Sequence, residues 1–115
     1  MGTTTQFSDG LIAFVKHACP TCTLIEDELR QAAKAVPGFR IVSQDDPRFP
    51  AGVDAVIDDR ELDVSFLHDI EATPTLISKR DGREIERVVG WDRAAWQRLT
   101  GIATLGASLP AMRPG

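Results

Sequence analysis

Hydrophobic residues in the first half of the chain fall into short runs whose spacing predicts a strand, a helix and a second strand. Residues 10–16 are a continuous apolar run bounded by polar residues, which indicates a strand buried on both faces. Apolar side chains then recur at helical spacing over residues 20–35, and Pro20 suits the first turn of the predicted helix. The Pro-Gly pair that follows ends this helix, and residues 39–43 predict the next strand.

The middle of the chain predicts a loop and then a short helix. Residues 45–59 contain two prolines and a glycine with little periodicity, so we expect a long loop there. Residues 60–68 have helical spacing. The side chains that this helix is expected to bury are those of Leu62, Phe66 and Leu67.

The last third of the chain predicts a hairpin and a final helix. Residues 75–78 and 84–89 are the expected strands, and the Asp81-Gly82 pair between them is a strong signal for a tight turn. Asp92 can then cap the last helix. One side of that helix carries the apolar residues Ala95, Trp96 and Leu99.

The order of these elements, β-α-β-α-β-β-α, predicts an α/β protein. A strand–helix–strand start implies a parallel pair with a right-handed crossover, and the hairpin adds an antiparallel pair. We therefore expect a mixed central sheet flanked by helices. The 115 residues suit one domain over residues 10–101, with an N-terminal extension of residues 1–9 and a tail or linker of residues 102–115.

Charge and hydropathy exclude several classes of function. The net charge is −4 and the basic residues are scattered, so there is no electrostatic case for binding nucleic acid or an anionic membrane. No apolar stretch approaches the roughly 18 residues of a membrane span, and the first residues lack the core of a signal peptide. We expect a cytoplasmic monomer.

The chemistry that the sequence offers lies in its only two cysteines, Cys19 and Cys22. A bridge between them would close too short a loop to stabilise the fold appreciably. They lie at the predicted strand-to-helix junction, where free backbone N–H groups and the helix dipole stabilise a thiolate. Because the thiolate is the nucleophile in disulfide exchange, we assign Cys19 as the nucleophile and Cys22 as the resolving thiol.

Other uses of the cysteine pair need groups that are scarce in this chain. A zinc site needs about two more ligands, and only His17 and His68 are available as histidines. A c-type haem needs histidine at position 23, which is Thr23. Inert core thiols are the remaining interpretation. We expect no metal and no cofactor other than a redox-active disulfide.

Three stretches together resemble the thioredoxin superfamily. They are residues 11–22, residues 70–77, and the pair 81–84 and 88–91. The resemblance implies the thioredoxin fold, exchange with protein disulfides, and reduction of the oxidised pair by a reductase or thiol donor. It also implies a cis-proline at Pro74 beside the cysteine pair. The residues expected to contact substrate are Pro20, Thr21, Thr73, Pro74 and Trp91.

The chain departs from thioredoxins at one chemically important position. Thioredoxins carry a buried aspartate six residues before the first cysteine, where this chain has Ala13. That carboxyl assists the resolving thiol, so the same proton-transfer aid is missing here unless another group replaces it.

Two alternatives to a thioredoxin-like reductase stay open. Glutaredoxins share the Cys-Pro-x-Cys pattern and a lysine matched by Lys16, which in that family binds the glutathione carboxylate, but this chain has no tyrosine to match their active-site tyrosine. His17 is either an exposed loop residue or a cation that stabilises the thiolate. The other alternative is a binding module whose cysteine pair senses redox state.

Overall fold

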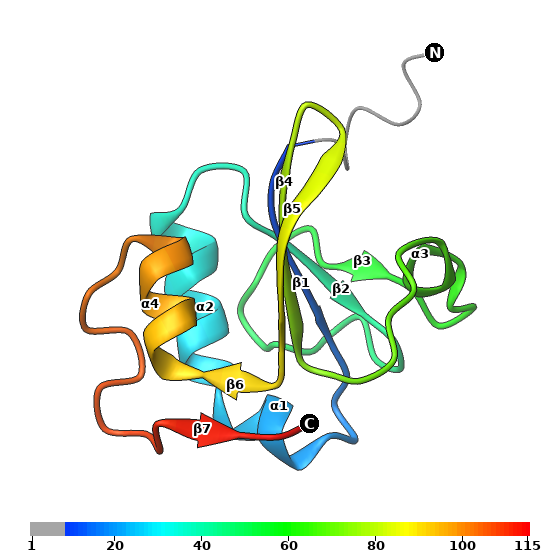
Figure 1. The fold of residues 1–115 in the computed structure, drawn as a ribbon. Coiled ribbons are helices and arrows are strands. Elements are labelled where there is room, and N and C mark those ends of the chain that lie inside the picture. Colours follow the sequence, from blue (N-terminus) through cyan, green and yellow to red (C-terminus); the bar gives the residue numbers. More distant parts are fainter. Residues whose placement is uncertain (1–8) are drawn as a thin grey trace.

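A five-stranded mixed sheet forms the centre of the protein (Figure 1). The computed structural model describes residues 9–115. The strands of this sheet are β1 (Gly10–Val15), β2 (Arg40–Ser43), β3 (Ile57–Asp58), β4 (Thr75–Arg80) and β5 (Arg83–Val89). Their order is β3-β2-β1-β4-β5, with β1 parallel to β2 and antiparallel to β4. The predicted mixed sheet is confirmed, whereas β3 lies within the stretch expected to be loop, because two residues are too few to show a strand pattern.

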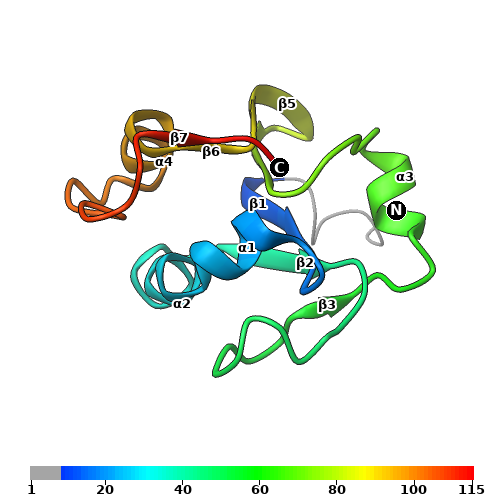
Figure 2. The same ribbon diagram turned by 90° about the horizontal axis from the view of Figure 1, so that it is seen from below.

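Helices cover both faces of the sheet (Figure 2). The elements on one face are α1 (Pro20–Leu24), α2 (Glu26–Ala35) and α4 (Arg93–Thr100), and α3 (Asp63–Leu67) lies on the other. Alternate residues of β1 serve the two faces, because successive strand side chains point in opposite directions. Ala13 packs in the cluster that contains Leu29 of α2, whereas Ile12 and Phe14 pack in a second cluster against Val64 of α3. The prediction that this strand is buried on both faces is confirmed.

The helix expected over residues 20–35 is divided in two at Ile25. This residue has φ −101° and ψ 19°, outside the helical region, although its side chain is fully buried. Helix α2 then begins with three acidic residues, Glu26, Asp27 and Glu28, which complement the positive end of its dipole. Helix α1 is therefore a separate short helix, with Cys19 at its N-cap and Cys22 within it.

The prediction for the short helix α3 is wrong in its burial. Leu62, Phe66 and Leu67 are 48%, 84% and 73% exposed. A polar interaction holds the start of this helix instead. The buried carboxylate of Asp59 accepts hydrogen bonds from the backbone nitrogens of Val64 (2.9 Å) and Ser65 (2.8 Å) and from the Ser65 hydroxyl (2.6 Å).

The predicted hairpin and the cap of the last helix are confirmed. Asp81 and Gly82 both have positive φ, 54° and 76°, and they join β4 to β5 in a tight turn. The side chain of Asp92 accepts a hydrogen bond from the Ala95 nitrogen at 3.2 Å, which is the N-cap interaction expected for α4. Trp96 is in the core, with 1% of its surface exposed.

The expectation of a tail or linker over residues 102–115 is wrong. Leu105 is fully buried in the core, and the Trp91 indole nitrogen donates to the Pro110 carbonyl oxygen at 2.9 Å. A two-stranded sheet then forms from β6 (Trp91–Asp92) and β7 (Met112–Arg113). Small residues and prolines predicted a linker, but a buried leucine and backbone pairing bind this segment to the domain. Residues 1–8 of the expected N-terminal extension lie outside the described residues.

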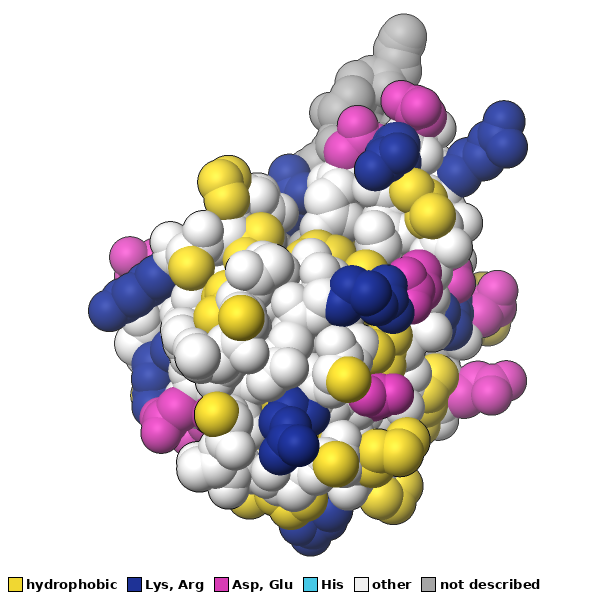
Figure 3. All heavy atoms as spheres, turned by 60° about the vertical axis from the view of Figure 1, so that its left-hand side comes forward, with side chains coloured by type: hydrophobic (Ala, Val, Ile, Leu, Met, Phe, Trp, Pro, Cys, Tyr) yellow, Lys and Arg dark blue, Asp and Glu magenta, His cyan; other side chains and the backbone are white. Residues whose placement is uncertain are grey.

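Charged side chains of both signs are mixed on the face that turns toward the viewer in Figure 3. Oppositely charged side chains pair in the structure, as in the bidentate contact between Arg98 and Glu86, with nitrogen–oxygen distances of 2.9 and 2.6 Å. Within residues 9–115, no helix has the length and hydropathy needed to cross a membrane.

Candidate active site

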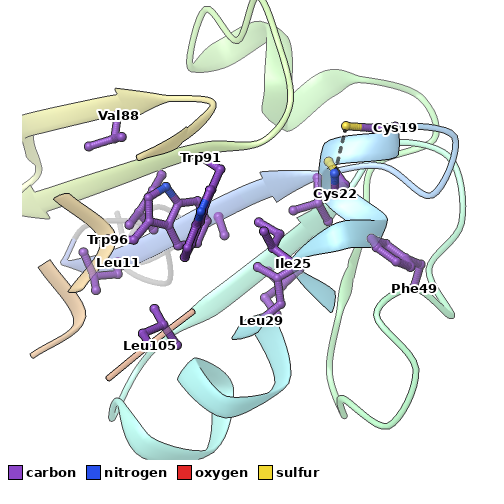
Figure 4. Close-up of a cluster of buried hydrophobic side chains, with 14 residues drawn as sticks. Leu11, Cys19, Cys22, Ile25, Leu29, Phe49, Val88, Trp91, Trp96 and Leu105 are labelled. Carbon is purple, nitrogen blue, oxygen red and sulfur yellow. Dashed lines mark hydrogen bonds between the residues drawn. The ribbon is translucent and has the colours of Figure 1, made fainter. Parts of the chain in front are cut away.

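Cys19 occupies the N-cap position of α1, immediately after the loop that leaves β1. Its backbone is extended (φ −117°, ψ 114°), and Pro20 begins the helix as the sequence predicts. The Cys19 sulfur accepts a hydrogen bond from the Cys22 backbone nitrogen at 3.2 Å, drawn as a dashed line in Figure 4. The sulfur therefore lies where the free N–H groups of the helix start point, and negative charge on it is stabilised there.

Thr73 is brought to Cys19 by the chain segment that enters β4. The Cys19 thiol donates to the Thr73 carbonyl oxygen, with a sulfur–oxygen distance of 3.4 Å. The peptide bond between Thr73 and Pro74 is cis, and the Pro74 carbonyl oxygen accepts from the Gly90 nitrogen at 2.7 Å. The structure thus places Thr73 and Pro74 next to the cysteine motif.

Cys22 lies one helical turn beneath Cys19 and is fully buried. It packs in the cluster that includes Ala13 and Ile25 (Figure 4). Burial, followed by the hydrogen bond with Cys19, raises the pKa of Cys22 to about 12. Its thiol is therefore protonated near neutral pH, and it must lose a proton before it can act as a nucleophile.

The raised pKa of Cys22 predicts that the reduced protein loses stability as the pH rises above about 9. The unfolded chain releases this proton near the ordinary thiol pKa of 9.0, whereas the folded chain keeps it until about 12. The free energy of unfolding should therefore fall in this interval, with a slope from this group approaching about 1.4 kcal/mol per pH unit. Denaturant unfolding of the wild type and of Cys22→Ser measures the difference, and equal slopes would contradict the raised pKa.

Asp45 is a positioning residue that the sequence pattern does not reveal. Its carboxylate accepts from the backbone nitrogens of His17 (2.7 Å) and Ala18 (2.9 Å), in the loop just before Cys19. The residue follows β2, which is parallel to β1, so both strands end at the same edge of the sheet. That topology was the only signal in the sequence that could have linked Asp45 to the cysteine loop.

The two accessory residues, Lys16 and His17, have different surroundings. A backbone hydrogen bond from Lys16 lowers the pKa of Cys22, against the larger effect of burial. The side chain of Lys16 is half-buried. The ring of the exposed His17 lies against that of Phe49, with centroids 5.3 Å apart.

Two of the residues expected to contact substrate are covered. Trp91 is 1% exposed, packs against Trp96 with ring centroids 5.3 Å apart and the ring planes tilted by 49°, and donates its indole N–H to a backbone carbonyl. The prediction of Trp91 as a substrate-binding residue is therefore wrong. Thr21 is 3% exposed, and its hydroxyl donates to the Pro114 carbonyl oxygen at 2.5 Å. Pro20 is exposed beside Cys19.

Among residues 9–115, no group of three or more histidine, cysteine, aspartate or glutamate side chains is arranged to hold a metal ion. Both cysteines are free thiols. The site thus consists of the Cys19 sulfur, which caps the start of α1, the buried Cys22 thiol beneath it, and the backbone of Thr73 beside it.

Comparisons with known proteins agree with this architecture. No protein-family model matches the chain. "Putative thioredoxin H10" of Arabidopsis thaliana is 30% identical over 95 residues, which cover 82% of this chain. The chain spans about half the length of this curated relative, 55%.

Solved structures with the same arrangement are thioredoxins and related proteins. Mitochondrial thioredoxin 3 of Saccharomyces cerevisiae is 23% identical, with a TM-score of 0.57, and the match covers 87% of this chain and 82% of that one. A putative thiol:disulfide interchange protein DsbE of Chlorobium tepidum is 23% identical, with a TM-score of 0.58 and coverage of 86% and 81%. The protein therefore has the thioredoxin fold. Its sequence is similar to that of the putative thioredoxin over most of the chain.

Proposed function

We propose that the protein is a thiol–disulfide oxidoreductase acting on protein disulfides, with Cys19 as the nucleophile and Cys22 as the resolving thiol. The observation that carries this proposal is the Cys19 sulfur at the N-cap of α1, 3.2 Å from the Cys22 nitrogen and 3.4 Å from the Thr73 carbonyl oxygen. A helix start stabilises the thiolate, and a second thiol one turn away is within reach of a mixed disulfide on the first.

The reaction transfers two electrons from the dithiol to the substrate disulfide. The Cys19 thiolate attacks one substrate sulfur, which forms a mixed disulfide and releases the other substrate sulfur as a thiolate. Cys22 then loses its proton and attacks the Cys19 sulfur. The Cys19–Cys22 disulfide forms, and the second substrate sulfur leaves as a thiolate. A reductase or thiol donor returns the oxidised pair to the dithiol.

The different environments of the two thiols support this division of roles. Cys19 is 5% exposed and Cys22 is fully buried, so Cys19 is the sulfur closer to an incoming disulfide. The backbone of Thr73 lies beside Cys19 and is the expected contact for an extended substrate. Pro20 follows Cys19 in the chain, and Pro74 follows Thr73.

Reduction of a protein disulfide such as insulin, with dithiothreitol as the electron source, tests the proposal. The wild type should accelerate the reduction and Cys19→Ser should be inactive. A binding module would leave the rate unchanged and would keep a protein partner after replacement of both cysteines. Turnover confined to a glutathione mixed disulfide, and lost in Lys16→Ala, would favour the glutaredoxin-like alternative.

A further inference from the structure

The segment of residues 112–115 lies across the face of the protein that contains the cysteine motif. In Figure 1 it begins with β7 and ends beside α1. Arg113 pairs with Trp91 between β7 and β6, and the Pro114 carbonyl oxygen accepts from the Thr21 hydroxyl at 2.5 Å. Thr21 is one of the two residues between Cys19 and Cys22, so this hydrogen bond ties the segment directly to the motif.

The end of this segment is in close contact with Thr73. A Cβ atom added to Gly115 would overlap the Thr73 carbonyl oxygen, so only glycine fits there without displacement. This is the same oxygen that the Cys19 thiol contacts at 3.4 Å. The segment therefore reaches the immediate neighbourhood of the proposed nucleophile.

The same segment also lies close to the backbone of Gly90. A Cβ atom at Gly90 would lie 3.0 Å from the Arg113 carbonyl oxygen, 3.4 Å from the Pro114 Cα and 3.6 Å from the Gly115 nitrogen. Three consecutive residues thus run along the backbone of Gly90, whose nitrogen bonds to Pro74. The segment occupies the strip of surface between α1 and the Thr73–Pro74 turn.

We propose that residues 112–115 are a built-in occupant of the substrate face, which a protein substrate must displace before it reaches Cys19. This inference rests on the proposed function and adds a control of access to the same site. The occupant binds as an extended chain along backbone and small residues, which is the mode in which an extended peptide adds to an existing edge.

The contacts that hold the segment are few enough to be exchanged for those of a substrate. The pairing of β7 with β6 involves two residues on each strand, and all residues from 112 to 115 are exposed. Because the segment is tethered, its contacts compete at a high effective concentration although each is weak. The rate of reaction at Cys19 should then follow the fraction of molecules in which the segment is displaced.

The variant Gly115→Val tests this proposal in the full chain. The added side chain cannot lie against the Thr73 carbonyl oxygen, so it should move the segment off the site. Ala111→Val is the matched control, because it adds bulk to the exposed residue that immediately precedes the segment. We expect iodoacetamide to alkylate Cys19 several-fold faster in Gly115→Val than in the wild type or the control, and kcat/KM for insulin to rise in parallel.

The two readouts separate failure of this proposal from failure of the proposed function. If insulin is reduced equally by the wild type and Gly115→Val and alkylation is unchanged, the occupant proposal is overturned and the function stands. If Cys19 is alkylated faster in Gly115→Val but neither the wild type nor any variant reduces insulin, the occupant proposal is supported and the proposed function is contradicted. Thr21→Val removes the hydrogen bond to Pro114 by a different route, so an alkylation rate unchanged in this variant as well would also overturn the occupant.

Discussion

Cys22→Ser should accumulate as a covalent mixed disulfide with its protein substrate, whereas Cys19→Ser should form none. Attack by the Cys19 thiolate creates the mixed disulfide, and only the Cys22 sulfur, one helical turn away, is placed to release it. Loss of the resolving thiol therefore stops the reaction after its first step. Loss of Cys19 stops it before any covalent bond forms.

Non-reducing gels and intact-mass spectrometry measure this difference after mixing each variant with an oxidised protein. The double variant Cys19→Ser/Cys22→Ser is the control for non-covalent association. Equal trapping by both single variants would contradict the assignment of roles. Trapping by Cys19→Ser alone would mean that Cys22 is the nucleophile and Cys19 is the resolving thiol.

Ala13→Asp should destabilise the protein and speed the resolution of its mixed disulfides. Ala13 is fully buried in β1, in the same cluster as Cys22. A carboxyl buried there without a partner should cost on the order of 1–3 kcal/mol of unfolding free energy. Burial keeps the Cys22 thiol protonated near neutral pH by raising its pKa, so a nearby base that accepts this proton should speed resolution.

Stopped-flow resolution rates near neutral pH, compared with melting curves, test both parts of this prediction. Ala13→Asn is the matched control, since it adds a polar group of the same size that cannot accept the proton. The aspartate variant should be faster than the asparagine variant, although both melt at lower temperatures than the wild type. If the resolution rate is the same in all three proteins, Ala13 is only a packing residue.

Local signals account for the parts of the fold that the sequence predicts well. The apolar run of β1, the Asp81-Gly82 turn and the Asp92 cap each depend on residues that are neighbours in the sequence. The spacing of Phe66 predicts a buried helical face, whereas its side chain is 84% exposed. A buried Asp59 holds that helix, and a capping carboxylate leaves no trace in the hydrophobic pattern.

Contacts between distant segments set the limit on what the sequence predicts about the site. The spacing and helix-start position of Cys19 and Cys22 are local features, and the structure places them as expected. The support from Asp45 and the cover from Pro114 depend on how segments far apart meet. The burial of Trp91 also depends on a contact between distant segments. Its indole N–H donates to Pro110, within residues 102–115, whose composition predicts a linker.

Titration of the cysteine pair against defined mixtures of reduced and oxidised glutathione, followed by intact mass, tests the central claim most directly. The account predicts one reversible two-electron transition in which the protein loses two hydrogen atoms as the Cys19–Cys22 disulfide forms. Cys22→Ser should instead stop at a glutathione adduct on Cys19. A wild-type protein that stays a dithiol throughout, or that collects only adducts without forming the internal disulfide, would contradict it.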